Sequence, residues 1–447
     1  MGLKRLSSGG TSRSLLLPLK HLEDDQQNDG YHHISLQSAV FSLSTSVVGM
    51  GIMGLPAIMV TVGLIPGIFL ILLVSFLTNF SINILLRYSY ECKAISYTGI
   101  MVHAFGRVGL VFLKTCIIIN NFGLLVLCLN IIADTLSGSE ASSVHYSGVL
   151  EEWADGQTWW NQRTAVMFLT TVFILAPLVF VWHTDHLEIS STTSMGTVIL
   201  FVIIVTTIFF YKLISGTISM PKLFPTVHPD TSTVLSLFTV MPILVTTYTC
   251  HHMIHPILSQ LGNESDSKRV ITISIRFCAA TYVITSAFAY ILFGDDTLND
   301  VMGNFNAELE VPYGTLFKDV IRLGFALHLI LVFPLLKFSL HMNLDSLFDQ
   351  SASPTTVDNS HFFLVTCSLL TAAFLGALSV PDVWTIFQCI GSTSAVCLCF
   401  VFPGSLVLRD QDGIYTVREK LIACFLIFLA SSVSVMAVFG DIYNLFT

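Results

Sequence analysis

Residues 49–56, Gly-Met-Gly-Ile-Met-Gly-Leu-Pro, place three glycines and a proline inside an apolar run that is long enough to cross a bilayer. Glycine costs about 1 kcal/mol and proline about 3 kcal/mol at an interior helix position, so a break in the helix is expected here. A membrane interior offers no water to the backbone groups that a break releases, and they must therefore meet protein or line a cavity. Backbone N–H groups at such a half-helix end can bind an anionic group of a small ligand, as in secondary transporters.

A second irregular segment lies at residues 241–256, where Pro242 and Pro256 bracket the run Val-Thr-Thr-Tyr-Thr. Prolines and β-branched residues are poor helix formers, so a second interrupted helix is expected. The two irregular segments fall in the first and sixth apolar runs of the chain. That spacing is expected of two five-helix halves related by an inverted repeat, although two ordinary proline-kinked helices would give the same pattern.

The elements that must position these breaks are membrane helices. Of the 447 residues, 53% are hydrophobic and 11% charged, and the mean hydropathy is +0.76, whereas soluble domains average about 25% charged residues. The sequence predicts an all-α polytopic protein of eleven spans, with ten or twelve as alternatives. The spans are 36–61, 64–88, 111–134, 163–184, 190–212, 232–257, 271–293, 316–337, 361–380, 382–408 and 418–441.

The positive charges indicate the orientation, because cytoplasmic loops are enriched in Lys and Arg. With a cytoplasmic N-terminus, fifteen of the twenty Lys and Arg residues fall on the cytoplasmic side and five on the other. The C-terminus then faces the outside or a lumen. Three regions are expected: a disordered cytoplasmic tail at 1–34, the membrane domain at 35–441 and a short luminal tail at 442–447.

Several other classes of function lack support in the sequence. All ten cysteines fall in spans or on the cytoplasmic side, so no disulfide framework is expected. His183, Asp185 and His186 are clustered, but a metal site there is disfavoured and no cofactor is expected. Because no convergent catalytic set and no basic patch is visible, neither an enzyme nor a nucleic-acid-binding protein is predicted.

Motifs along the chain resemble the amino acid/auxin permease family. Residues 41–45 (Phe-Ser-Leu-Ser-Thr), followed by residues 49–56, are similar to the family's first span, with its F-N-L-S and G-x-G-I-L-x-L-P pattern. Within the family the chain looks closest to plant vacuolar amino acid transporters, which are relatives of the sodium-coupled neutral amino acid transporters. The resemblance covers residues 35 to 441. The other matching residues are Cys250-His251 and Pro256-Ile257 in span six, and Arg322-Leu323 and Val332-Phe333-Pro334 in span eight.

This resemblance implies the fold of the amino acid–polyamine–organocation superfamily, with span eleven added outside a five-plus-five core. It also implies secondary active transport by alternating access. The substrate carboxylate would lie beside Gly49 and meet the N–H groups of Met50, Gly51 and Ile52. The α-ammonium would meet carbonyls of the broken region and span-six groups at residues 245–248 (Val-Thr-Thr-Tyr).

Side chains that could contact the rest of the substrate are polar residues at depth. Thr246, Thr247, Tyr248 and Thr249 are in span six, and Asn120 and its neighbour Asn121 are in span three. Buried threonines commonly bond to the preceding helical turn, and intramembrane asparagines often link helices, so a structural role is the alternative for each. No acidic residue lies at mid-depth in spans one, six or eight. Neutral amino acids are therefore the predicted substrates.

The coupling ion is predicted from hydroxyl groups and histidines. Ser42, Ser44 and Thr45 could contribute to a cation site, but Ser42 replaces the Asn of the sodium-coupled relatives, and Val332 falls where they carry Thr. His251 and His328 are intramembrane candidates for proton transfer. Proton-linked or uncoupled transport is therefore favoured. A sodium symporter, or an amino acid sensor with the same binding site, is the alternative.

Overall fold

The computed structural model describes residues 35–94, 96–141, 144–181, 187–225, 231–259, 261, 263–305, 309–348, 359–410 and 413–446. In these ranges the chain is mainly helical. Nine helices are long and apolar enough to cross a membrane, and a bent pair raises the number to ten. The predicted all-α polytopic fold is confirmed. The predicted tail at 1–34 and the cluster at 183–186 lie outside the described residues, and the domain limits stay predictions.

The first span is broken where the glycines predict it. Helix α2 (Leu36–Val47) and helix α3 (Gly51–Val62) meet at an angle of 55° across three residues. The Ser35 side chain caps α2 by accepting a bond from the Ser38 N–H at 3.1 Å. Pro56 lies inside α3 and is buried, so the residue that is least tolerated in a helix does not interrupt this one. The interruption lies earlier, at the glycines that precede it.

The sixth span is also broken, as predicted. Helix α10 (Thr231–Thr247) and helix α11 (His251–Leu258) are separated by three residues. This pair is not among the ten. When α10 and α11 are counted as one broken span, each of the eleven predicted spans contains helical structure.

The other spans are longer or less regular than predicted. They are α4 (Leu64–Glu91), α5 (Tyr97–Ser137), α7 (Arg163–Thr170) with η1 (Thr171–Leu175) and α8 (Ala176–Val181), α9 (Leu187–Ile214), α12 (Glu264–Phe293), α14 (Gly314–Phe348), α15 (Asn359–Ser379), α16 (Val383–Ile390) with η5 (Gly391–Ala395), η6 (Cys397–Val401) and α17 (Phe402–Leu408), and α18 (Val417–Phe446). Gly106, with φ 64° and ψ -149°, is non-helical and divides α5 into a short first helix and a long second one that contains the predicted third span. The π-helical segments η5 and η6 in the tenth span were not predicted.

Short elements connect the spans on the side opposite the predicted cytoplasmic face. Strands β1 (Gly138–Ala141) and β2 (Val144–Ser147) form an antiparallel hairpin and lead into α6 (Val149–Trp153). The 3-10 turn η3 (Gly294–Asp296) and helix α13 (Val301–Asn304) connect α12 to α14. Helix α13 packs on α3 and α5.

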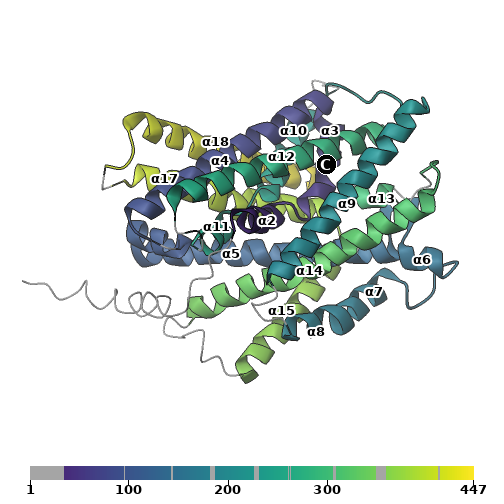
Figure 1. The fold of residues 1–447 in the computed structure, drawn as a ribbon, viewed down its shortest axis with the longest axis horizontal. Coiled ribbons are helices and arrows are strands. Elements are labelled where there is room, and N and C mark those ends of the chain that lie inside the picture. Colours follow the sequence, from purple (N-terminus) through teal and green to yellow (C-terminus); the bar gives the residue numbers. More distant parts are fainter. Residues whose placement is uncertain are drawn as a thin grey trace, which may run out of the picture.

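Packing places the two broken spans inside the molecule. Helix α12 packs against both halves of the first span and against α4 and α9, and α14 packs against α5 and α9 (Figure 1). Ten of the twelve residues of α3 are buried. The breaks are therefore surrounded by protein, while the lipid-facing sides of the outer helices carry exposed apolar residues such as Phe69, Phe76 and Phe428.

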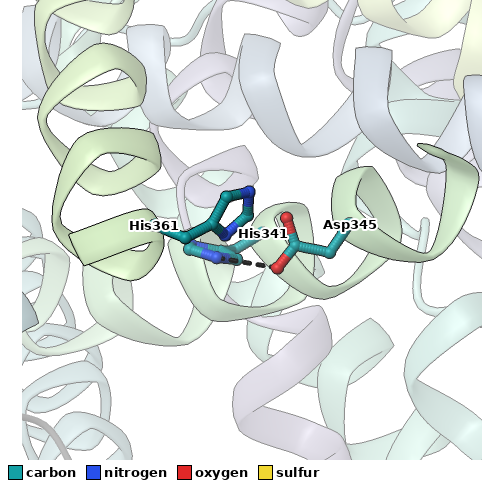
Figure 2. Close-up of side chains that lie close together, drawn as sticks. All are labelled: His341, Asp345 and His361. Atoms are coloured by element: carbon teal, nitrogen blue, oxygen red, sulfur yellow. Dashed lines mark ion pairs between the residues drawn. The ribbon is translucent and has the colours of Figure 1, made fainter. Parts of the chain in front are cut away.

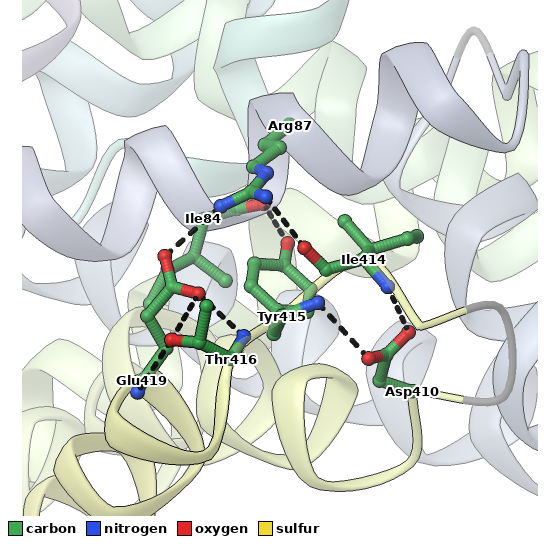
Figure 3. A network of polar contacts seen from close by, with 7 residues as sticks. All are labelled: Ile84, Arg87, Asp410, Ile414, Tyr415, Thr416 and Glu419. Atoms are coloured by element: carbon green, nitrogen blue, oxygen red, sulfur yellow. Dashed lines mark hydrogen bonds and ion pairs between the residues drawn. The ribbon is translucent and has the colours of Figure 1, made fainter.

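The eleventh span is attached to the second by a polar network (Figure 3). Arg87 of α4 forms an ion pair with Glu419 of α18 at 2.9 Å and also donates to the Ile414 carbonyl. The Tyr415 hydroxyl donates to the Ile84 carbonyl at 2.8 Å. Asp410 accepts from the Ile414 and Tyr415 N–H groups. These bonds fix the loop before α18 on α4.

Candidate transport site

The two broken helices touch at Gly51. A Cβ atom built on Gly51 would lie 2.5 Å from Cγ2 and 2.7 Å from Oγ1 of Thr247, which is closer than any side chain can be placed without movement. Glycine is required here by the close approach of the two chains. The first residue of α3 is therefore packed directly on the last residue of α10.

Gly49, two residues earlier, has the opposite surroundings. A Cβ atom built there would meet no atom within 4 Å, and the residue is half-buried although its neighbours Val48 and Met50 are buried. The break in the first span thus has one side closed against the sixth span and one side next to open space.

Backbone groups at this break are left without partners. The Val48 N–H still bonds to the Ser44 carbonyl at 2.7 Å and ends α2. Within the described residues, the N–H groups of Gly49, Met50 and Gly51 have no hydrogen-bond acceptor. The predicted donor Ile52 differs, because its N–H bonds to the Gly49 carbonyl at 3.3 Å. Three adjacent free donors at the start of α3 can bind an anion.

The break in the sixth span is closed by its own side chains. Thr246 and Thr247 donate to the carbonyls one turn earlier, those of Pro242 at 3.0 Å and Ile243 at 2.8 Å. Thr249 likewise donates to the Val245 carbonyl at 2.7 Å. These bonds are the structural role that buried threonines commonly have.

Tyr248 is the exception in this segment. It is fully buried, and its hydroxyl makes no hydrogen bond of ordinary length in the described part of the chain, although the Ser75 side chain of α4 lies near it. Its ring packs edge-to-face on Tyr282, with the ring centroids 5.3 Å apart. Burying an unpaired hydroxyl is unfavourable by about 1–3 kcal/mol, so a ligand partner would recover free energy here.

Tyr282 of α12 connects the two breaks. Its hydroxyl lies 2.7 Å from the Val47 carbonyl and 3.1 Å from the Thr247 carbonyl, the last residues of α2 and α10. One hydroxyl proton thus serves two helix C-termini whose carbonyls have lost their helical partners. Tyr282 was not among the residues predicted from the sequence. The available signal was a tyrosine in the middle of an apolar span, where its hydroxyl needs an acceptor.

Met50 reaches the third span. The Sγ atom of Cys128 lies 3.3 Å from the Met50 Sδ atom, and both side chains are buried. Asn120 has a different place: its amide lies 3.5 Å from the Asn121 Oδ1 atom, and Asn121 donates to Ser339 of α14 at 2.9 Å. Cys128 therefore contacts the break, while the predicted Asn120 is part of a link between spans three and eight.

The hydroxyl candidates for a cation site lie along α2. Thr45 donates to the Phe41 carbonyl at 2.9 Å, and the Ser42 carbonyl accepts a bond from Ser46 at 3.0 Å. The Ser44 hydroxyl is buried and has no partner among the described residues. The Ser44 hydroxyl is therefore available to a ligand, and the bond to the Ser42 carbonyl leaves the Ser42 hydroxyl available as well.

The two candidate histidines lie in separate places. His251 is buried, and its Nε2 atom is 3.2 Å from the Ser81 hydroxyl of α4. His328 is buried between α14 and α9, with Nδ1 2.6 Å from the Ser194 hydroxyl and 3.1 Å from the Ser194 carbonyl. Nδ1 can donate to the carbonyl or accept from the hydroxyl. With either tautomer, the buried Nε2 has no partner in the described structure.

A family model described as transmembrane amino acid transporter protein matches residues 32–447. The chain belongs to this family. The amino acid transporter AVT6A of Arabidopsis thaliana is 40% identical over 431 residues, covering 96% of this chain and 93% of the relative. The amino acid transporter AVT6B of the same plant is 40% identical over 433 residues, covering 96% and 94%. The resemblance read from the two broken spans is confirmed.

Solved structures share the fold at much lower identity. The manganese transporter of Eremococcus coleocola, in complex with an aromatic bis-isothiourea substituted compound, superposes with a TM-score of 0.54. It is 12% identical and covers 92% of this chain and 88% of its own. A histidine-to-alanine mutant of the same transporter gives a TM-score of 0.52 at 12% identity, covering 94% and 89%. By its family match and its curated relatives, the protein is a multi-pass membrane protein of an amino acid transporter family, and not an enzyme.

Proposed function

We propose that this protein carries neutral amino acids across the vacuolar membrane by alternating access, with the N-terminus in the cytoplasm. One observation carries the proposal: three adjacent N–H groups at residues 49–51 are free, and they lie between open space at Gly49 and the sixth span at Thr247. A substrate carboxylate fits these donors, because helix N-termini stabilise anions by up to about 2 kcal/mol.

The α-ammonium group would be bound by carbonyls at the breaks and by the Tyr248 hydroxyl. Residues 36–62 and 231–258 contain no Asp or Glu, so a cationic side chain would have no partner of opposite charge there. This composition favours neutral substrates. The proposed substrate-binding residues remain Gly49, Met50, Gly51, Ile52, Val245, Thr246, Thr247, Tyr248 and Asn120.

Transport is proposed to be proton-linked or uncoupled. Val332 supplies no oxygen where a sodium site between spans one and eight would need one, whereas His328 offers an unpaired ring nitrogen beside that region. Ser42, Thr45 and His251 are the other candidates for ion or proton binding. The sodium-coupled alternative depends on the free Ser44 hydroxyl and on backbone carbonyls.

The experiment is uptake of radiolabelled amino acids by sealed vesicles that contain the purified protein. Uptake driven by an imposed pH gradient and indifferent to sodium would support the proposal. Uptake that requires sodium would replace the proton mechanism with the symporter. If no amino acid is taken up while binding is retained, the sensor alternative takes its place.

A further inference from the structure

Three potential metal ligands meet where α14 ends and α15 begins (Figure 2). His341 and Asp345 are four residues apart on one face of α14, and His361 is in the first turn of α15. One ring nitrogen or carboxylate oxygen from each residue lies within 4.8 Å of the others. This group is on the predicted cytoplasmic side and shares no residue with the transport site.

We propose that His341, Asp345 and His361 form a Zn²⁺ site that links α14 to α15. Two imidazole nitrogens and one carboxylate oxygen are a donor set suited to zinc, with water as the fourth ligand. Magnesium and calcium prefer all-oxygen sites, and Cu(I) prefers sulfur. The chemistry of the three donors therefore selects a borderline divalent ion.

Burial of the three ligands suits reversible binding. His341 is buried and Asp345 half-buried, and they already lie 2.9 Å apart through Nε2 and Oδ2. His361 is exposed, so its ring can move toward the other two donors and close the remaining distance. The exposed side also provides an entry path for the ion. The fixed pair comes from one helix and the adjustable ligand from the next.

Lys337 competes with the metal. Its Nζ atom lies 3.1 Å from His341 Nδ1, so the lysine donates there and the ring proton is at Nε2, facing Asp345. A zinc ion at Nε2 displaces that proton, and a neutral ring then carries its proton at Nδ1, where it would oppose the Lys337 donor. Lys337 has two other partners, the Thr366 hydroxyl at 2.6 Å and the Phe362 ring at 4.2 Å, and these can hold it when the bond to His341 is lost.

The test measures zinc binding to the purified full-length protein in detergent, by competition with a chromophoric chelator. Wild type is expected to bind one more zinc ion than His361→Ala, a variant in which an exposed side chain is removed and the core is left intact. Asp345→Asn is expected to weaken this site at least tenfold, because it removes the only anionic ligand. His103→Ala, which removes another exposed histidine on the cytoplasmic side, is the matched control and should bind as wild type does.

Lys337→Met is expected to strengthen zinc binding, whereas His361→Ala and Asp345→Asn are expected to weaken it. This difference distinguishes a specific zinc site from a general loss of zinc affinity. Removing the competing donor should tighten zinc binding about tenfold. Zinc should also raise the unfolding temperature of wild type and not that of His361→Ala, since an ion bound only to the folded state stabilises it. Equal zinc binding by wild type and His361→Ala, or weaker binding by Lys337→Met, would overturn the proposal. Neither readout requires transport, so the result is independent of the proposed function.

Discussion

The two helix breaks differ in how their backbone groups are satisfied. At the first break no side chain bonds to the released backbone, and three consecutive N–H groups have no acceptor within the described residues and lie beside open space at Gly49. At the sixth-span break three threonine hydroxyls bond to carbonyls of the preceding turn, and every residue from Pro242 to His251 is buried. The first break is thus open to a ligand. The second break is enclosed by buried residues, and the Tyr248 hydroxyl is an unpaired polar group among the described ones.

A bulky residue at the contact between the two breaks should have the largest effect. Gly51→Leu places a side chain where even a Cβ atom would lie 2.5 Å from Thr247, and it separates the donors from the sixth span. Amino acid uptake by reconstituted vesicles should be abolished, while the protein still reaches the membrane. Gly196→Leu is the matched control, because Gly196 of α9 is exposed and has open space around it. Wild-type uptake by Gly51→Leu would refute carboxylate binding at this break.

The next largest effect is expected at the tyrosine that joins the breaks. Tyr282→Phe leaves the Val47 and Thr247 carbonyls without their shared donor, so the free energy of unfolding should fall by about 1–3 kcal/mol. Uptake should fall about tenfold, which corresponds to about 1.4 kcal/mol.

Tyr248→Phe tests the contrast, since it removes a hydroxyl that makes no hydrogen bond of ordinary length in the described structure. It should leave the unfolding temperature unchanged or raise it, and it should raise KM for the substrate. Equal losses of stability in both variants would show that the two tyrosines do not differ as described.

A smaller effect, on the shape of the pH profile, is expected at the eighth span. His328→Ala removes the unpaired Nε2 nitrogen, so uptake should depend less on pH while KM changes little. His103→Ala again serves as control, because that exposed histidine is far along the chain from both breaks. An unchanged pH profile in His328→Ala would remove this residue from the proton mechanism.

The smallest effect is expected from a threonine of the closed break. Thr249→Val keeps the shape of the side chain and loses its bond to the Val245 carbonyl, an acceptor one turn away. A bond of this kind contributes about 0.5–1.5 kcal/mol, so thermal unfolding should shift slightly and KM should stay close to wild type. A large rise in KM would mean that Thr249 contacts substrate, and the closed break would then resemble the open one.

Local chemistry explains which parts were predictable. Glycine and proline act on their own segments, so both breaks could be located from residues 49–56 and 241–256. The third span was predicted close to its place after Gly106, but the short helix before that glycine was not predicted, because it lies outside the most apolar stretch. The first π-helical turn of the tenth span begins at Gly391, which packs directly on the backbone of Pro242, and a contact between such distant residues leaves no mark in a local pattern.

The sequence by itself determined that the chain is a membrane protein with interrupted first and sixth spans, because apolar length and helix-breaking residues act within a few turns. Only the tertiary structure decided which break stays open, that Tyr282 joins Val47 to Thr247, and that Cys128 lies beside Met50. These outcomes depend on residues that are far apart in the chain, 235 positions for Tyr282 and Val47. Hydrogen bonds and close packing between such residues are set by the arrangement of whole helices, which no local preference specifies.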